Sequence, residues 1–404
     1  MTDVTAGSVP QKPLVHLDRG PVATVVLALI IGTIAIGALV DFRQALLFLI
    51  GSLLGITLYH ASFGFTGGWR RLVVERRGAS MRAQMLMIAV AAVAFIPLLS
   101  LGSAFGQPLA GAIAPVGISV LFGAALFGLG MQLGGGCGSG TLFTVGGGSS
   151  RMLVTLIFFI AGALLGTAHL PWWLELPALP PVSLGTSLGV PLALAITLAG
   201  LGAVAWISAV VERRVHGSLE RPKPSRHQGW QRFFVGPWPL IGAGLALAGL
   251  NLATLLLAGH PWSVTYGFGL WGAKIAQVVG VPVSDWQFWT WPAQAKALQS
   301  SVLEDVTSVM DFGIILGAAL AAGLAGKFAP KMQVPFLSLL AAAIGGTLMG
   351  YGARLSFGCN IGALFSGIAS GSLHGWLWFA AAFTGSLAGI YLRPFFGLDS
   401  FKAK

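Results

Sequence analysis

Long, apolar and uncharged stretches dominate this sequence and restrict its fold more than any other feature. Ten of them, each about twenty residues long, match the length that a helix needs to cross about 30 Å of hydrocarbon. Backbone polar groups in hydrocarbon must bond within the protein, which helices achieve. The sequence therefore predicts an all-α integral membrane protein with about ten spanning helices. The expected spans are residues 21–40, 44–62, 83–102, 113–133, 152–168, 189–211, 235–258, 311–326, 335–354 and 374–391.

Charge is scarce and is concentrated in short loops. Charged residues make up 9% of the chain, against about a quarter in soluble domains. The net charge of +11 comes largely from the loops at 70–82, 212–232 and 327–331 and from the C-terminal tail, whereas 103–112, 169–185 and 281–308 are neutral or mildly acidic. By the positive-inside rule the basic loops and both termini lie in the cytoplasm. The charge thus reflects topology in a lipid bilayer, and nucleic acid is not an expected partner.

The spans and loops predict five consecutive parts. Residues 1–20 are polar and lack the apolar core of a cleavable signal peptide, so they are expected to form a flexible cytoplasmic tail. A first membrane repeat at 21–211 precedes a basic cytoplasmic linker at 212–234. A second membrane repeat at 235–392 and a cytoplasmic tail at 393–404 follow.

The chain has two cysteines, and each lies in the same kind of glycine-rich phrase: GLGMQLGGGCGSGTLF around Cys137 and GYGARLSFGCNIGALF around Cys359. When the cysteines are superimposed, four glycines of the first phrase fall on four of the second: Gly128, Gly130, Gly136 and Gly140 on Gly350, Gly352, Gly358 and Gly362. In the predicted topology, Cys137 is reached near the cytoplasm and Cys359 near the outer face. The phrases therefore indicate a five-plus-five inverted repeat, which places a substrate site near the midplane.

A second, weaker pair of phrases supports the repeat. HASFGFTGGWRR at 60–71 resembles SVTYGFGLWGAK at 263–274. Both are short, glycine-rich and aromatic, and both follow an apolar run, so they are predicted to be re-entrant. Each half then carries two broken helices. By contrast, the glycine pairs Gly162/Gly166 and Gly385/Gly389 are four residues apart and indicate helix packing.

This pattern favours an anion as ligand. Irregular backbone at membrane depth survives where protein buries it, and a helix that begins after such a turn directs free N–H groups and a positive dipole end at the site. Asp and Glu are expected to be absent from the depth of every span, whereas a cation pathway commonly carries a buried carboxylate. A thiol is a weak, polarizable donor, which suits a sulfur atom better than a hard oxyanion.

The candidate substrate-binding residues are the two cysteines and their neighbours: Gly136, Cys137, Gly138, Ser139, Gly358, Cys359 and Asn360, with His60 and Arg354. Arg354 is expected to attract anions at the outer mouth, and His60 to line the path. Each has a structural alternative. A membrane cysteine is often an apolar filler, an interfacial arginine can reach lipid headgroups, and a lone histidine can simply pack.

No cofactor, metal or catalytic residue is expected. The sequence has no G-x-x-x-x-G-K-[ST] phosphate loop, and two distant cysteines form neither a disulfide framework nor a metal cluster. GCGSG lacks the preceding strand of a dinucleotide fingerprint. The sequence therefore predicts a protein that is not an enzyme.

The phrases GGGCGSGTL, FGCNIGALFSGIASGSLHGWLWF and YHASFGFTGGWRR resemble the YeeE/YedE family of bacterial inner-membrane sulfur-transport proteins, over about residues 45–390. The resemblance implies an inverted-repeat helical fold with short re-entrant helices and uptake of thiosulfate. It further implies that Cys137 and Cys359 relay the anion through S–H to S contacts, and that a small cytosolic sulfur-carrier protein is a partner.

One departure from the family leaves alternatives open. Thiosulfate-transporting members carry a third functional cysteine, which this chain lacks, so either another residue such as His60 takes that place or the substrate differs. A selenium-containing analogue is one such substrate. A membrane thiol-disulfide redox protein is a further alternative, although such a protein is expected to have closely spaced cysteine pairs. A passive structural subunit is the third.

Overall fold

The computed structural model describes residues 17–221, 227–328 and 333–398. Ten helices in these ranges are long and apolar enough to cross a membrane, which confirms the predicted all-α membrane fold. They are built on α1 (Arg19–Leu39), α2 (Phe42–Ala61), α4 (Ala79–Leu101), α5 (Ile118–Gly134), α7 (Ser150–Leu174), α9 (Val190–His216), α11 (Leu240–Ala258), α15 (Val306–Leu324), α16 (Phe336–Leu355) and α18 (Leu373–Leu392). Most of the predicted N-terminal tail, and the end of the C-terminal one, lie outside the described residues.

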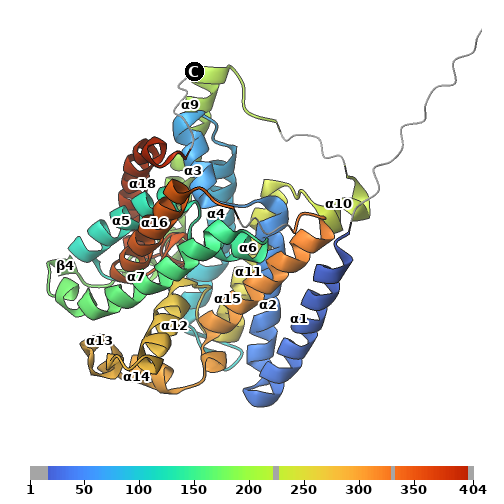
Figure 1. The fold of residues 1–404 in the computed structure, drawn as a ribbon. Helices are drawn as coiled ribbons and strands as arrows, with labels where there is room; N and C mark the ends of the chain where they lie inside the picture. The colour runs from blue at the N-terminus through green and yellow to red at the C-terminus, as the bar shows by residue number, and fades with distance from the viewer. Residues whose placement is uncertain (1–16, 222–226, 329–332, 399–404) are drawn as a thin grey trace, which may run out of the picture.

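Four short helices follow or precede the spans. They are α3 (Phe65–Val74), α6 (Gly138–Gly146), α12 (Thr265–Val278) and the π-helix η3 (Asn360–Ser366), which continues into α17 (Gly367–Ala369). The predicted broken elements thus coincide with separate short helices. Figure 1 shows α13 (Gln287–Thr290) and α14 (Pro292–Gln299) at the end of the molecule opposite α10 (Gly229–Val235).

The remaining elements are small and lie in connections. They are α8 (Leu184–Leu188), the 3-10 turns η1 (Val283–Asp285), η2 (Val302–Glu304) and η4 (Arg393–Phe396), and two strand pairs, β1 (Ser103–Ala104) with β2 (Gln107–Pro108) and β3 (Val116–Gly117) with β4 (Ala178–Leu179).

Glycines let the central helices pack backbone against backbone. Gly162 of α7 faces the carbonyl of Thr347 on α16, and Gly385 of α18 faces that of Ala125 on α5, so close that a Cβ at either glycine would clash. Small residues at such crossings are how membrane helices associate. The prediction that these glycine pairs form packing faces is therefore confirmed.

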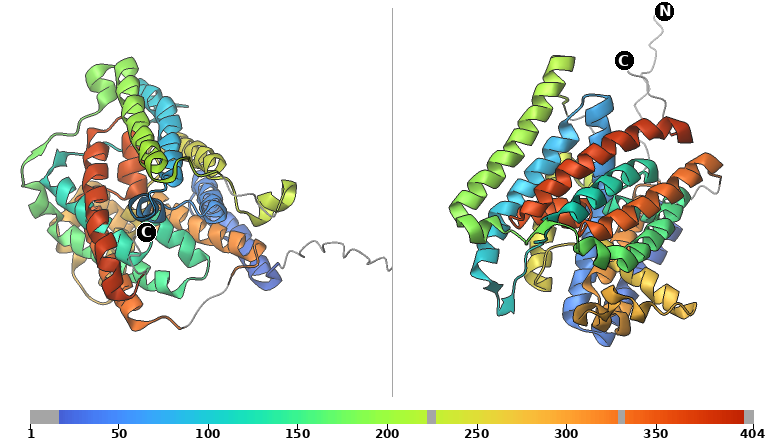
Figure 2. Two further views of the ribbon diagram at one scale, coloured as in Figure 1. Left: turned by 90° about the horizontal axis from the view of Figure 1, so that it is seen from above. Right: turned by 90° about the vertical axis from the view of Figure 1, so that its left-hand side faces the viewer.

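The contacts cross between the two halves of the chain. In the centre, α7 packs on α16, α5 on α18 and α2 on α15, while α4 packs on α11. The helices α1 and α9 are peripheral. Only 6% and 17% of the most apolar 18-residue stretch of each is buried inside the protein. Figure 2 shows α9 at the edge of the molecule beside α4. Helices of the two halves thus pair with one another, and the inverted relation between the halves stays a prediction.

The carboxylates of Asp311 and Glu212 lie deeper in the helices than expected. Asp305 caps α15 by accepting hydrogen bonds from the Ser308 amide and hydroxyl (2.8 and 2.6 Å), so α15 begins five residues before the predicted span and encloses Asp311 at 0% exposure. The expectation that Asp and Glu are absent from the depth of the spans is therefore wrong. Likewise α9 runs on to His216 and encloses Glu212, which was expected in the linker.

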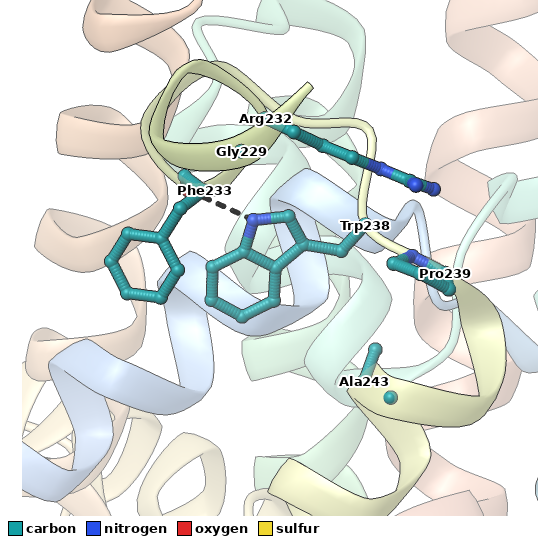
Figure 3. Close-up of a pocket in the computed structure, with 7 residues that line it drawn as sticks. Gly229, Arg232, Phe233, Trp238, Pro239 and Ala243 are labelled. Carbon is teal, nitrogen blue, oxygen red and sulfur yellow. Dashed lines mark hydrogen bonds between the residues drawn. The ribbon is translucent and has the colours of Figure 1, made fainter. Parts of the chain in front are cut away.

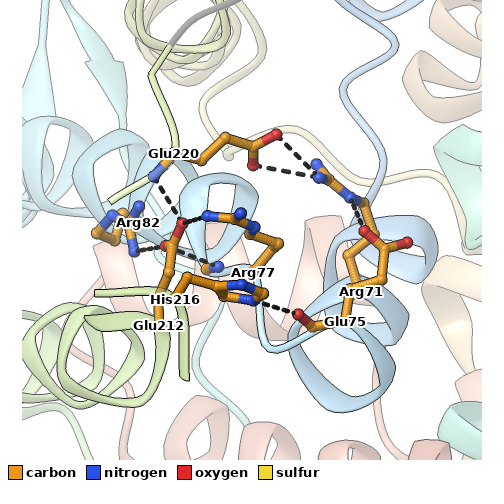
Figure 4. A network of polar contacts seen from close by, with 8 residues as sticks. Arg71, Glu75, Arg77, Arg82, Glu212, His216 and Glu220 are labelled. Carbon is orange, nitrogen blue, oxygen red and sulfur yellow. Dashed lines mark hydrogen bonds and ion pairs between the residues drawn. The ribbon is translucent and has the colours of Figure 1, made fainter. Parts of the chain in front are cut away.

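Glu212 is the centre of a buried ion network at the basic end of the molecule (Figure 4). Its carboxylate contacts Arg77 at 3.2 Å and Arg82 at 2.8 Å. It also accepts from the backbone amides of Gly78 (3.1 Å) and Glu220 (2.7 Å). Four partners compensate a side chain that is 0% exposed, so this carboxylate ties the α3–α4 turn to the segment that follows α9.

We expect Glu212→Ala to lower the free energy of unfolding by about 3–5 kcal/mol, because it leaves two half-buried arginines and two backbone amides without their buried partner. The measurement is the melting temperature of the purified protein in detergent. Glu75→Ala is the matched control, since Glu75 pairs with Arg71 at a side-chain exposure of 54% and such pairs contribute below about 1 kcal/mol. Equal melting temperatures for the two variants would contradict the prediction.

Candidate functional site

Cys137 lies at the start of a helix that follows a sharp turn. The span α5 ends at Gly134, and Gly135 takes a left-handed φ of +92° that glycine tolerates best. Arg151 holds this end by donating to the carbonyls of Leu133 and Gly134, both at 2.6 Å. Cys137 then caps α6, and its sulfur accepts from the Gly140 amide at 3.4 Å. The turn thus directs a thiol and a helix N-terminus to one point.

Cys359 occupies the equivalent place after α16. Phe357 and Gly358 have φ of +57° and +150°, and Ser356 stabilises the turn through a bond from its hydroxyl to the Gly352 carbonyl (2.6 Å). Trp378 donates to the same hydroxyl at 3.0 Å. Cys359 caps η3, with its sulfur accepting from the Ile361 amide at 3.4 Å. Both cysteines are therefore N-caps of short helices.

The structure brings the two cysteine phrases together. A Cβ built on Gly138, the residue after Cys137, would lie 3.1 Å from Sγ of Cys359. The thiols are 1% and 0% exposed. The topology alone placed one near each face of the membrane. The thiols lie closer together than this topology implied. The reason is that α5 ends at Gly134 and α16 at Leu355, and the chain turns into the interior at Gly135 and Gly358.

The other two short helices also begin here. The Phe65 amide at the start of α3 lies against the Cys137 sulfur. At the start of α12, the side chain of Thr265 lies 3.4 Å from a Cβ built on Gly138, and Ser263 Oγ lies 3.4 Å from one built on Gly362. Four helix N-termini therefore converge on the buried thiols, and their partial positive charges add there.

Polar side chains inside the spans hold α3 and the segment before α12 in place. Trp69 of α3 donates to Gln84 of α4 at 3.1 Å, and Gln132 of α5 donates to the Thr66 carbonyl at 3.2 Å. Asn251 of α11 accepts from the Trp262 amide at 2.8 Å and donates to Ser366 at 3.2 Å. Gln84, Gln132 and Asn251 were not among the expected site residues. The signal available was an amide side chain in an apolar run, which needs a buried partner.

Several buried polar atoms at this centre have no hydrogen-bond partner among the described residues. They include both amide atoms of Asn360 and the hydroxyl of Thr66. Asn360 is 0% exposed and directly follows Cys359. Since orphaned polar groups in a buried site are costly, their presence beside the thiols is typical of a ligand site. Ser139 instead contacts Cys137, with Oγ 3.6 Å from Sγ.

Arg354 approaches the same region from α16. Its guanidinium carbon lies 5.5 Å from the Tyr266 ring centre and 5.1 Å from that of Phe288. Its Nε is buried and has no hydrogen-bond partner in the described part of the chain, and Gly269 of α12 leaves room for the head group. Arg354 is therefore a cation held by aromatic faces near the α12 N-terminus, with donors free to meet an anion.

His60, at the end of α2, packs against the segment that precedes α11. Its ring is 5.5 Å from that of Trp238, and its carbonyl accepts from the Trp238 amide at 3.0 Å. The far side of Trp238 lines a surface pocket of about 280 Å³ with Phe233 and Arg232. Figure 3 shows Trp238 donating to the Phe233 carbonyl in this pocket, at 2.9 Å. His60 thus contacts the residues between α10 and α11, and its role in lining the path stays a prediction.

Comparison with known proteins is consistent across most of the chain. A family model described as sulphur transport matches residues 60–388, which contain both cysteine phrases and all four short helices. A thiosulfate transporter TsuA from Spirochaeta thermophila is 29% identical over 337 residues, covering 81% of this chain and 92% of that protein. The thiosulfate transporter TsuA of Escherichia coli is 25% identical, covering 85% and 94%. The probable transporter YedE of Escherichia coli is 32% identical over 168 residues, covering 38% and 41%.

We expect Gly358→Ala to destabilise the site, because alanine does not readily adopt a φ of +150° and its Cβ would lie 2.8 Å from the Ala363 amide. The expected cost is about 1–3 kcal/mol, measured as a lower melting temperature in detergent. Gly362→Ala is the control in the same phrase, since its Cβ would meet only the Ser263 side chain, at an ordinary contact distance of 3.4 Å to Oγ. A Gly358→Ala protein as stable as the control would show that the turn is not strained.

Proposed function

This chain belongs to the sulphur-transport family, and we propose that it takes up thiosulfate or a closely related sulfur-containing anion into the bacterial cytoplasm. The proposal includes the topology of the sequence analysis, with both termini and the basic loops on the cytoplasmic side of the inner membrane. The relatives are named as transporters, which supports a role other than catalysis.

The observation that carries the proposal is the meeting of two thiols with four helix N-termini. The helix ends supply fixed positive potential for the charged oxygens of the anion. The thiols of Cys137 and Cys359 supply weak S–H donors that a terminal sulfur atom accepts. Weak contacts suit transport, because a site that binds too tightly stops release.

In the proposed path the anion first meets Arg354 and then the thiols. Arg354 lies beside Tyr266 near the start of α12, and the orphaned amide of Asn360 lies next to Cys359. Transfer from Cys359 to Cys137 needs little displacement, since Gly138 is in contact with the Cys359 sulfur. Both thiols are buried, so entry and exit require local movement of the surrounding side chains.

Two adjacent thiols also reduce the need for a third cysteine at the centre. We propose that His60 acts at the cytoplasmic exit, where it packs on Trp238. A small cytosolic sulfur-carrier protein is the proposed acceptor of the anion there. A selenium-containing analogue has the same contacts available, because selenium is a soft acceptor like sulfur.

The proximity of the thiols favours one second candidate, a membrane thiol-disulfide redox protein. Its cycle would form a Cys137–Cys359 disulfide and pass two electrons and two protons to an acceptor such as a quinone. The phrases contain no C-x-x-C motif, which argues against it. Mass spectrometry of the protein from cells, with thiols blocked before lysis, distinguishes the candidates, because a transporter retains both free thiols.

We expect Cys137→Ser and Cys359→Ser each to reduce thiosulfate uptake to the level of cells without the protein, because serine is a harder and weaker partner for sulfur. The measurement is growth of a sulfur-starved host on thiosulfate, together with uptake of radiolabelled thiosulfate. Ser187→Ala, at an exposed position of the short helix α8, is the control for expression and membrane insertion. Full uptake by both cysteine variants would exclude a thiol relay.

We expect Arg354→Gln to raise the KM for uptake by about tenfold or more, the loss expected for one charge-assisted contact, with a smaller effect on the maximal rate. Arg354→Lys keeps the charge but not the planar stacking on the rings, so an intermediate KM is expected. Arg214→Gln, which removes an arginine charge at an exposed position of α9, is the control. An unchanged KM in Arg354→Gln would place the arginine outside the path.

A further inference from the structure

Asp311 is a buried carboxylate that the transport path described above does not use. It is 0% exposed, and neither side-chain oxygen has a hydrogen-bond partner within the described residues. It lies at the depth of Gly51, which contacts the adjacent Met310 from the middle of α2. A carboxylate without partners in such a place is costly, and ionisable groups inside membrane segments commonly serve function.

No positive charge compensates Asp311 in the described part of the chain. Its electrostatic neighbours are Asp305 on the same helix and Cys359 on η3. Lys274 of α12 donates instead to the carbonyls of Leu298 and Ser300, at 2.9 and 2.6 Å. Other elements packed on α15 carry their ionisable groups nearer to its ends: Arg19 of α1, Arg43, Tyr59 and His60 of α2, Arg232 of α10 and Glu304 of η2.

Polar side chains lie between Asp311 and one face of the protein. Asp305 lines a pocket of about 340 Å³ with His260, Tyr266 and Lys296, beside α14, on the side that the proposed topology places outside. Ser308 bonds Asp305 at 2.6 Å. Both Ser308 Oγ and Asp311 Oδ2 border Gly267, at 3.3 and 3.2 Å from a Cβ built there. Asp305, Ser308 and Asp311 therefore follow one another from the pocket toward Cys359.

Transport of an anion into a cell is opposed by the inside-negative membrane potential. The sequence contains no phosphate-binding loop for nucleotide-driven uptake, so the energy is expected to come from a cation that moves inward. A hard metal cation takes six or more oxygen ligands, and the contacts around Asp311 offer far fewer. A proton needs a single carboxylate.

We propose that uptake is proton-coupled and that Asp311 is the group that carries the proton. This inference rests on the proposed function. A proton enters from the outer pocket by way of Asp305 and Ser308, binds a carboxylate oxygen of Asp311 while the anion occupies the thiols, and leaves to the cytoplasm with it. No covalent bond other than the O–H bond changes, and the charge moved with each anion falls by one.

The test uses the purified full-length protein in liposomes, with the membrane potential clamped by potassium and valinomycin. A pH gradient of one unit, acid outside, drives about tenfold accumulation when one proton accompanies each anion. We expect wild type to accumulate radiolabelled thiosulfate in response to this gradient. We expect Asp311→Asn to lose that response and to retain exchange of external for internal thiosulfate, which needs no net proton movement.

Asp285→Asn, an exposed carboxylate of the same face, is the control and should behave as wild type. Thiosulfate uptake in wild type without any response to the pH gradient would overturn proton coupling and leave the proposed function intact. Accumulation by Asp311→Asn equal to that of wild type would overturn the role of Asp311. No transport by wild type under any gradient would refute the proposed function and with it this inference.

A variant that fails to fold is detected by its melting temperature and by loss of exchange. Asp311→Glu, which restores an ionisable carboxyl, then decides the matter. Recovery of the pH response in Asp311→Glu supports the proton carrier, and exchange without any pH response in that variant overturns it.

Discussion

The turns before Cys137 and Cys359 leave backbone groups free at a depth where lipid offers no hydrogen bonds, and the protein must supply every partner. Arg151 and Arg393 donate to the carbonyls at the end of α5. Ser356 donates to the Gly352 carbonyl in the last turn of α16 and to the Gly358 carbonyl in the turn that follows. On the other side of each turn, the cysteine sulfur accepts an amide of the next helix. Without these partners the helices could not end where the thiols are needed.

Close packing fixes where these helix ends meet. Because Gly162 and Gly385 let α7 approach α16 and α18 approach α5 at backbone distance, the spans leave little space between them, and the short helices fill what remains. The amide side chains of Gln132 and Asn251 then fix the direction of α3 and of the segment before α12. The geometry of the site thus depends on small residues for position and on buried amides for orientation.

Much of the fold could be predicted from local sequence, because span length and loop charge are set by the bilayer. The ten spans and the breaks after Gly134 and Leu355 are of this kind. The depth of Asp311 could not be predicted in this way. It depends on the N-cap that Asp305 forms with Ser308, which shifts the start of α15. The proximity of Cys137 and Cys359 likewise depends on how far each half folds back, and the placement of His60 on Trp238 depends on the path of the linker.

The buried carboxylate of Glu212 has a consequence for motion. It joins the α3–α4 turn to the end of α9 and to the Glu220 amide beyond it, while glycine contacts clamp α5 and α7 to α16 and α18. Swinging one half of the molecule against the other would separate backbones that interlock. Movement of the short helices and their flanking side chains costs less free energy. The packing of the spans therefore favours a fixed scaffold with small gates on either side of the site over rigid-body rocking of the two halves.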